Sequence, residues 1–495
     1  MWYNLNIMKT NRLFAVAAML AAGTVFGDIA AVTPTAWNGK RDCWQLRRHD
    51  QKMKEIAAGG AKVVFIGDSI THFWEGKGKE QLKKYFSEGD MKMLNLGFSG
   101  DRTEHVLWRL DHGELDGYKA KCVLLMIGTS NTGHKSFDKE PPIDTFLGIR
   151  KILAKIREKQ PDAVVVLTAI FPRGDSERDS RRMRNDVVNA EIMKLCDGKT
   201  VFWCDFSDKF LDENGDIQWV MKDRLHPDAS GYEIWYKEVK PYIDWALADR
   251  KGPAPKNRFS TAKTAFQKEM ASKPATVVPT TRIAGASVKK GQKRGDWWSD
   301  RLLQKRNQIA DSKGEIDLVF FGDSITHNWE GAGKKQLAEL AKTYSILDFG
   351  YGGDRTQHLV WRGLNGELDG YKAKCVMLMI GTNNRESVED IANGVRRVLE
   401  VIAQKQPDAK TLLLPIFPRG EGPANARRIA NEKVNAIIKN CADGKRVIWV
   451  DFNSKFLDEK GDTKWIMPDR LHPNAAGYKI WTDEVLPYFK SICGK

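Results

Sequence analysis

Short apolar runs alternate with amphipathic segments along most of the chain. In the N-terminal half the apolar runs are rich in β-branched residues, and the longer segments between them place apolar residues at helical spacing. Continuous apolar strands separated by helices are typical of a parallel sheet that helices cover on both faces, an α/β fold. The pattern predicts strands at 62–66, 93–96, 122–127, 163–170 and 201–204, and helices at 76–86, 143–159, 182–195 and 231–248.

The C-terminal half repeats both this pattern of apolar and amphipathic segments and many of the residues themselves. The run Val-Val-Phe-Ile-Gly-Asp-Ser-Ile-Thr-His at 63–72 returns as Leu-Val-Phe-Phe-Gly-Asp-Ser-Ile-Thr-His at 318–327, and eleven identical residues stand at 113–123 and 366–376. Because the period has the size of a domain, it indicates two copies of one domain rather than a solenoid. The second copy predicts strands at 317–321, 346–349, 375–380, 411–416 and 447–450.

The N-terminus has the layout of a signal peptide. Lys9 and Arg12 precede an uncharged apolar stretch at 13–27, and small residues follow. This stretch is too short for a stable transmembrane helix, so we expect a secreted or periplasmic protein without integral membrane association; the alternative is a buried N-terminal helix. The predicted organisation is a leader over 1–31, a first α/β domain over 32–250, a linker over 251–295 and a second α/β domain over 296–495.

The formal net charge of +15 is concentrated between the two domains. The segment 251–295 holds eleven Lys or Arg residues, one acidic residue and four prolines. This composition is typical of a solvated linker, although the segment could also touch an anionic surface. No nucleic-acid motif accompanies it, so we expect no nucleic-acid partner.

The seven cysteines predict neither a metal site nor a disulfide framework. Their number is odd and no Cys-x-x-Cys pair occurs. Cys122 and Cys375 begin apolar strands, where cysteine is usually a small buried residue.

A serine follows the first strand of each copy. Ser69 and Ser324 stand in Gly-Asp-Ser, between a buried strand and a helix, where a nucleophile is exposed beside backbone N–H donors. An activated serine needs a base, and the base needs a group that orients it. Asp-x-x-His supplies both, as Asp223 with His226 in the first copy and as Asp469 with His472 in the second. The alternative is a turn capped by aspartate with a surface histidine.

Four blocks in this order resemble a known superfamily. Gly-Asp-Ser, then Gly-Gly-Asp, then Gly-Thr-Asn-Asn, then Asp-x-x-His is similar to the SGNH hydrolases, the GDSL-type esterases. The flanking Asn-Leu-Gly-Phe-Ser-Gly-Asp-Arg-Thr at 95–103 looks like the platelet-activating-factor acetylhydrolase Ib catalytic-subunit branch. The resemblance implies a tandem of flavodoxin-like three-layer αβα domains, with the two serines as nucleophiles and with no metal and no cofactor.

The same resemblance assigns the oxyanion hole, in which the two copies differ. It implies that Gly100 and Gly353 donate their backbone N–H groups and that Asn383 donates its side-chain amide. Ser130 stands where the first copy should have that asparagine. Because loss of one oxyanion donor costs roughly 10²–10³ in rate, we expect the second copy to be the stronger catalyst. Asn131 could swing in to replace the missing amide.

The sequence therefore predicts a serine esterase that works through an acyl-enzyme, and the resemblance implies short-chain esters, above all acetyl esters, as its substrates. For an exported protein we expect a small-molecule or polysaccharide ester as substrate, with the acetyl group on a carbohydrate. The alternatives are an acetylhydrolase or lysophospholipase-type esterase that acts on lipids, and a first copy that has become a carbohydrate-binding module. The oligomeric state does not follow from the sequence.

Overall fold

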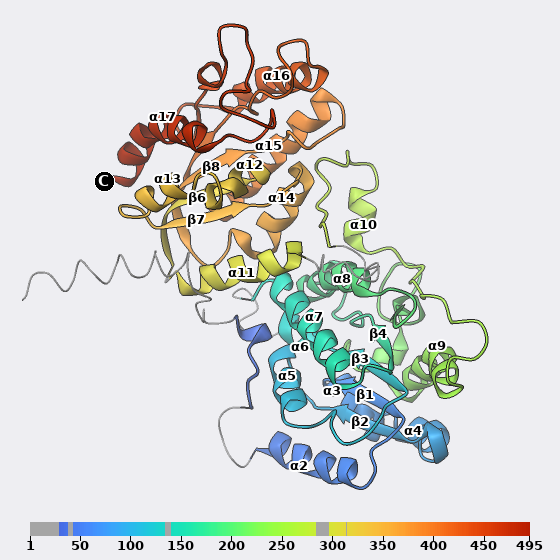
Figure 1. The fold of residues 1–495 in the computed structure, drawn as a ribbon. Coiled ribbons are helices and arrows are strands. Elements are labelled where there is room, and N and C mark those ends of the chain that lie inside the picture. Colours follow the sequence, from blue (N-terminus) through green and yellow to red (C-terminus); the bar gives the residue numbers. More distant parts are fainter. Residues whose placement is uncertain (1–28, 38–42, 134–139, 284–296, 313) are drawn as a thin grey trace, which may run out of the picture. The chain divides into compact units, whose positions relative to one another are not determined.

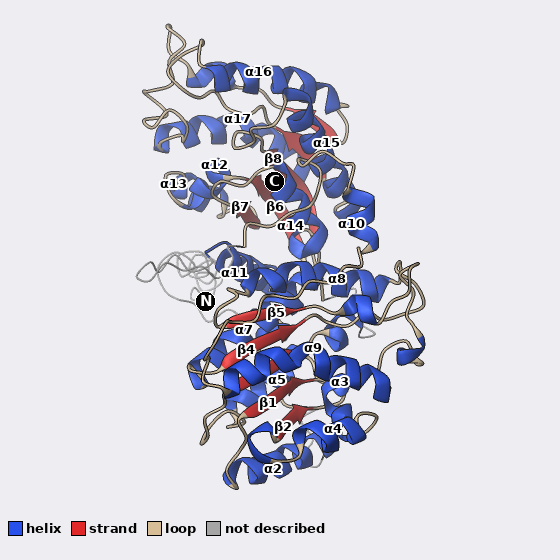
Figure 2. Ribbon diagram, turned by 90° about the vertical axis from the view of Figure 1, so that its right-hand side faces the viewer, coloured by secondary structure: helices blue, strands red, loops and turns tan. Residues whose placement is uncertain are grey.

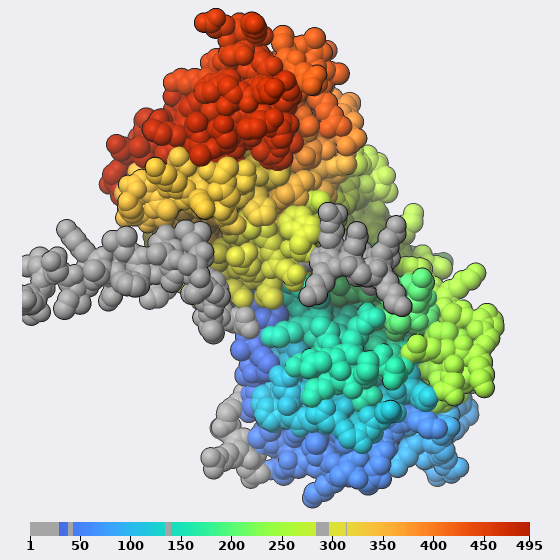
Figure 3. All heavy atoms as spheres, in the orientation of Figure 1, coloured from blue at the N-terminus to red at the C-terminus, as the bar shows by residue number. Residues whose placement is uncertain are grey.

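The computed structural model describes residues 29–37, 43–133, 140–283, 297–312 and 314–495 (Figure 1). The chain divides into two compact units. The first unit contains the described residues of Asp28–Ser272 and Ile283–Ser299, and the second contains Lys273–Arg282 and the described residues of Asp300–Lys495. In Figure 3 the colours run from blue in the first unit to red in the second.

The first unit is built on a five-stranded parallel sheet. Its strands are β1 (Val63–Gly67), β2 (Met93–Gly97), β3 (Cys122–Met126), β4 (Val164–Thr168) and β5 (Val201–Cys204). They pair in the order β2-β1-β3-β4-β5, and every strand residue is buried. This is the flavodoxin-like strand order that the resemblance to the SGNH hydrolases implies. The apolar runs predicted the parallel sheet, because strands buried on both faces have no polar side.

Helices cover both faces of this sheet (Figure 2). On one face, Phe65 packs against Trp74 and Trp235 in a continuous apolar cluster beneath α4 and α9. On the other face, α5, α7 and α8 lie side by side. The helices of this unit are α2 (Trp44–Ala57), α3 (Ser69–His72), α4 (Lys79–Phe86), α5 (Thr103–Asp111), α6 (Thr129–Gly133), α7 (Pro142–Lys159), α8 (Ser180–Ile192), α9 (Ala229–Leu247) and α10 (Ala265–Met270).

The second unit repeats this architecture. Its strands β6 (Glu315–Gly322), β7 (Ile346–Gly350), β8 (Lys372–Met379), β9 (Lys410–Leu413) and β10 (Val447–Trp449) pair in the order β10-β9-β8-β6-β7, again all parallel. Its helices are α11 (Trp297–Asp311), α12 (Ser324–His327), α13 (Lys334–Leu340), α14 (Thr356–Arg362), α15 (Val388–Lys405), α16 (Ala426–Ile438) and α17 (Ala475–Cys493). The predicted α/β class with parallel sheets is confirmed in both units.

The segment predicted as a linker contacts the units at a few positions, although most of its described residues are exposed. Arg258 lies beside β5, where its N–H donates to Trp203 O at 2.9 Å and its carbonyl accepts from Asp205 N at 3.0 Å. Residues 273–282 belong to the second unit, and 284–296 lie outside the described residues. The predicted leader lies outside them too, except for residues 29–31, of which Ala31 is fully buried.

The described part of the chain contains no helix that combines the length and the apolar character needed to cross a bilayer. All seven cysteines are free, and Cys122 and Cys375 are buried as predicted.

Candidate active site

The first strand of each unit ends in a tight turn that presents the serine. Asp68 caps α3, since its Oδ1 accepts a hydrogen bond from Ile70 N at 3.0 Å, and Ser69 is the first residue of that helix. In the second unit Asp323 makes the same contact with Ile325 N at 2.9 Å, and Ser324 begins α12. Burial raises the pKa of both capping aspartates to about 7. The serines therefore stand at the carboxyl ends of β1 and β6, where α/β sheets bind their ligands.

A hydrogen-bonded series links the serine to the Asp-x-x-His loop in the first unit. Ser69 Oγ lies 2.9 Å from His226 Nε2, and His226 Nδ1 lies 2.9 Å from Asp223 Oδ2. The other oxygen of Asp223 accepts from the backbone N–H groups of Leu225 and His226. These contacts fit a neutral imidazole that donates from Nδ1 to the carboxylate and accepts the serine proton at Nε2.

The second unit contains the same series. Ser324 Oγ lies 2.9 Å from His472 Nε2, and His472 Nδ1 lies 2.6 Å from Asp469 Oδ2. Asp469 Oδ1 accepts from Leu471 N and His472 N. The six residues predicted from Gly-Asp-Ser and Asp-x-x-His are thus brought together as two separate triplets.

The backbone of each Asp-x-x-His loop is unusual. Arg224 and Arg470, the residues after the two aspartates, have φ angles of 59° and 60°. This left-handed region is uncommon for residues other than glycine and is maintained only where surrounding contacts fix it. Arg224 donates to Ile217 O at 2.8 Å, and its carbonyl accepts from Gly174 N at 3.0 Å. These contacts hold the turn that brings the carboxylate back to the imidazole.

The charges around His226 favour a neutral imidazole beside an ionised carboxylate. Burial lowers the pKa of His226, and the nearby Lys77 and Arg173 act in the same direction, whereas Asp223 opposes them. Burial on its own would raise the pKa of Asp223, but the N–H groups of His226 and the ammonium of Lys77 hold it well below its usual range. A neutral imidazole is the form that accepts a proton from serine.

The predicted oxyanion glycines lie at positions that only glycine fits well. Gly100 and Gly353 have φ angles of 80° and 76°, in the left-handed region. A Cβ on Gly100 would also lie 3.1 Å from the ring of Trp37.

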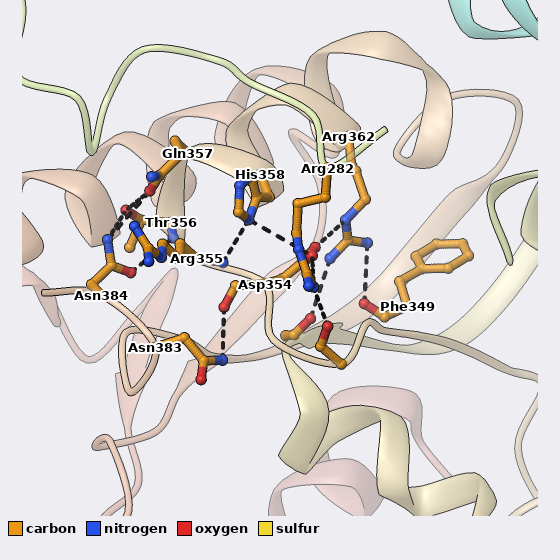
Figure 4. Close-up of polar contacts among 12 residues, drawn as sticks. Arg282, Phe349, Asp354, Arg355, Thr356, Gln357, His358, Arg362, Asn383 and Asn384 are labelled. Carbon is orange, nitrogen blue, oxygen red and sulfur yellow. Dashed lines mark hydrogen bonds and ion pairs between the residues drawn. The ribbon is translucent and has the colours of Figure 1, made fainter. Parts of the chain in front are cut away.

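The third predicted oxyanion position differs between the units, as the sequence indicates. Asn383 donates from Nδ2 to Asp354 O at 3.0 Å, so its amide lies against the turn that contains Gly353 (Figure 4). Ser130 holds the equivalent position in the first unit. The equivalence follows from the next residue, because Asn131 Oδ1 accepts from Thr103 N and Asn384 Oδ1 accepts from Thr356 N.

Asn131 does not swing in to replace the missing amide. Its side chain is fully buried, and its Nδ2 donates to Glu140 Oε1 at 2.7 Å. With Oδ1 on Thr103 N, both ends of the side chain secure the N-terminus of α5. The prediction that the Asn131 amide replaces the missing oxyanion donor is therefore wrong.

A buried arginine holds each Gly-Asp-Arg-Thr turn from behind. Arg109 Nε donates to Asp101 Oδ2 at 2.9 Å and also pairs with Glu114. Arg362 Nε donates to Asp354 Oδ2 at 3.0 Å and pairs with Glu367. All of these carboxylates are fully buried, so each turn is fixed by charges that water cannot screen.

The sequence interpretation missed two arginines next to the site. Arg173 Nη1 donates to Thr129 O at 2.8 Å and to Thr129 Oγ1 at 3.0 Å, and Arg419 makes the same bonds to Thr382 at 2.8 and 3.1 Å. Both support the strand end that carries the third oxyanion position. A signal was present, because Ile-Phe-Pro-Arg-Gly occurs at 170–174 and again at 416–420.

The fold and the Ser–His–Asp site together define the class of enzyme to which the chain belongs. A flavodoxin-like domain with serine, histidine and aspartate joined in series at the carboxyl end of its sheet has the architecture of a carboxylic ester hydrolase. The chain belongs to the GDSL-like Lipase/Acylhydrolase family, whose model matches residues 65–234 and 320–480. Both units are thus members of this family, in tandem.

Similar proteins of known name cover one unit at a time. The human platelet-activating factor acetylhydrolase IB subunit alpha2 is 35% identical over 184 residues, which is 36% of this chain and 79% of that protein. The human alpha1 subunit is 34% identical over 174 residues, 34% of this chain and 74% of that protein. An acetylxylan esterase from Geobacillus stearothermophilus matches in structure with 19% identity and a TM-score of 0.30, over 36% of this chain and 95% of its own.

Proposed function

We propose that the protein is an exported tandem serine esterase that removes short acyl groups, above all acetyl, from carbohydrates. The observation that carries the esterase mechanism is the Ser–His–Asp hydrogen-bonded series, which is complete in both units. The apolar stretch at 13–27 supports export.

The geometry supports a two-step mechanism. His472 Nε2 takes the proton of Ser324 Oγ, and the serine oxygen attacks the ester carbonyl. The negative charge that develops on the carbonyl oxygen is stabilised by the Gly353 N–H, the serine N–H and the Asn383 amide. The tetrahedral intermediate collapses, His472 returns the proton to the departing alcohol, and an acyl-serine remains. Water, deprotonated by the same imidazole, then releases the acid and regenerates Ser324.

In this mechanism the first unit is the weaker catalyst. Ser69, His226 and Asp223 can perform the same proton transfers, but Ser130 offers a shorter donor than the amide of Asn383. The loss of one such donor costs about 3–4 kcal/mol of transition-state stabilisation. A first unit that only binds carbohydrate is the alternative, and fluorophosphonate labelling distinguishes the two: labelling of Ser324 without labelling of Ser69 would favour the binding module.

Exposed tryptophans support a carbohydrate as the alcohol part of the ester. Trp219 and Trp465 stand four residues before Asp223 and Asp469, and 64% and 52% of their surfaces are exposed. A large apolar ring that remains in water at the same position of both units suits stacking against a sugar face. A lipid-borne short acyl chain is the second candidate, supported by the 34–35% identity to the platelet-activating factor acetylhydrolase subunits.

Acetate release separates these substrates. The purified chain is incubated with acetylated xylan, acetylated sialic acid and a phospholipid with a short acyl chain, and the released acetate is measured against the Ser69→Ala/Ser324→Ala double variant. Faster release from the glycans supports the proposal. Release from the phospholipid alone would replace it with the lipid function, and release from none of them would refute both.

A further inference from the structure

A short segment crosses the N-terminus of α5 in the first unit. Residues 29–37, which we call strap 1, belong to the first unit and precede α2 in sequence. Thr103 Oγ1 donates to the carbonyl of Ala31 at 2.8 Å, and the N–H of Thr35 donates to Glu104 O at 3.1 Å. Strap 1 therefore lies along the Gly-Asp-Arg-Thr block that contains the predicted oxyanion glycine.

The second unit has an equivalent strap inside the segment predicted as a linker. Residues 274–282, strap 2, make the same two contacts with α14. Thr356 Oγ1 donates to Thr276 O at 3.0 Å, and Thr280 N donates to Gln357 O at 3.3 Å. Strap 2 thus corresponds residue by residue to strap 1.

Strap 1 ends in a planar side chain that covers the oxyanion turn. Trp37 Nε1 donates to Asp101 Oδ1 at 2.7 Å, and its ring stacks on His105 with 4.1 Å between the ring centres. A Cβ on Gly100 would lie 3.1 Å from the same ring, which is a tight contact.

Strap 2 ends in a different planar side chain at the same place. Arg282 Nη1 donates to the carbonyl of Gly352 and lies 3.5 Å from Asp354 Oδ1 (Figure 4). A Cβ on Gly353 would lie 2.9 Å from Arg282 Nη1. The carbonyl of Asp354 accepts in turn from the amide of Asn383. Arg282 and Asn383 therefore bind the same three-residue turn, and Gly353 stands in the middle of that turn.

We propose that Arg282 is a positioning residue of the second active site and that strap 2 is part of this site. Arg282 holds the turn 352–354 so that the Gly353 N–H and the Asn383 amide face one point. Trp37 has the same role in the first unit, because tryptophan and arginine both present a planar group with an N–H donor. This inference rests on the proposed esterase function, in which the turn stabilises the oxyanion.

The test uses the full chain with Ser69→Ala, so that only the second site is active. Arg282→Ala is expected to lower kcat on p-nitrophenyl acetate by roughly tenfold to a hundredfold, since small misplacements of catalytic groups have effects of this size. KM stays within about twofold, because the turn acts on the transition state. Arg282→Trp introduces the residue that strap 1 has at this position, and it recovers most of the rate. The new ring can stack on His358, because His358 is equivalent to His105, on which Trp37 stacks.

A matched control and a measurement independent of activity complete the test. Lys273→Ala removes an exposed cation one residue before strap 2 and leaves kcat unchanged. Hydrogen exchange of a peptide that spans 350–356 becomes faster in Arg282→Ala but not in Lys273→Ala. Unchanged kcat and unchanged exchange in Arg282→Ala would overturn the inference. If the Ser69→Ala parent had no esterase activity, the proposed function would be refuted. Faster exchange in Arg282→Ala would then still show that Arg282 holds the turn 352–354.

Discussion

Lys77 Nζ lies 2.9 Å from Asp223 Oδ2, the same carboxylate oxygen that lies 2.9 Å from His226 Nδ1. The imidazole of His226 and the ammonium of Lys77 thus share one oxygen of Asp223 in the first unit. The equivalent position in the second unit is Ala332, so Asp469 has no such competitor there. This difference between the two sites is additional to the exchange of Ser130 for Asn383.

Removal of Lys77 should shift the pH dependence of the first site. With Ser324→Ala as background, Lys77→Ala removes a positive charge that lowers the pKa of His226, so that pKa rises. Because protonated imidazole cannot accept the serine proton, the acidic limb of kcat/KM moves to higher pH. The measurement is the pH profile of p-nitrophenyl acetate hydrolysis across the titration range of histidine.

The reciprocal change provides the control. In the Ser69→Ala background, Ala332→Lys places an ammonium beside Asp469, and the acidic limb of the second site should move to lower pH. Lys79→Ala, at an exposed lysine two residues from Lys77, should leave the profile of the first site unchanged. Identical profiles for Lys77→Ala and its parent would show that the Lys77–Asp223 contact has no influence on the base.

Exchange of the residues at the third oxyanion position, Ser130 and Asn383, should weaken the second site and strengthen the first. Asn383→Ser in the Ser69→Ala background is expected to lower kcat by roughly 10²–10³, because one transition-state donor is lost. Ser130→Asn in the Ser324→Ala background should raise kcat of the first site. Steady-state kinetics on p-nitrophenyl acetate measure both effects. If Asn383→Ser retained the full rate, the asparagine would have no part in catalysis.

The buried arginine behind the oxyanion turn should be important for stability. Arg362→Leu leaves Asp354 and Glu367 buried without this partner, and loss of one partner of a buried pair costs about 3–5 kcal/mol. Urea unfolding followed by tryptophan fluorescence measures the loss. Arg396→Leu is the matched control, since the exposed pair of Arg396 with Glu389 contributes less than about 1 kcal/mol.

Trp465 should affect binding of glycans but not the chemical step. Trp465→Ala removes an exposed ring, and aromatic contacts contribute roughly 0.5–1.5 kcal/mol, so KM for an acetylated oligosaccharide should rise about twofold to tenfold. Kinetics on p-nitrophenyl acetate should not change, because that substrate has no sugar. Trp465→Phe keeps a ring and should give an intermediate KM. An unchanged KM for the oligosaccharide in Trp465→Ala would remove this support for a carbohydrate substrate.

The sequence predicted the sheets and the Ser, His and Asp positions for physical reasons. Strands such as 122–127 are buried on both faces, so their residues are continuously apolar. Ser69 and His226 stand in short blocks whose chemistry repeats in the second half of the chain. Local spacing was sufficient for Asp223, because an aspartate three residues before a histidine can reach its ring within one loop.

Contacts between distant segments could not be predicted in this way. The alternative role for Asn131 was wrong because its amide is bound by Thr103 and Glu140, neither of which is adjacent in sequence. The straps were missed because only four of nine residues agree between 29–37 and 274–282, and the second strap has the composition of a linker. Trp37 and Arg282 occupy equivalent positions in the two straps but are different residue types, so alignment of the two sequences does not relate them.

The most direct test compares the two single-serine variants of the full chain. The initial rate of p-nitrophenyl acetate hydrolysis is measured for Ser69→Ala, for Ser324→Ala and for the double variant at equal concentration. We predict that Ser69→Ala retains most of the parent rate, that Ser324→Ala retains about one hundredth of it or less, and that the double variant has none. Equal residual rates in the two single variants would contradict the asymmetry, and full activity in the double variant would contradict the serine mechanism.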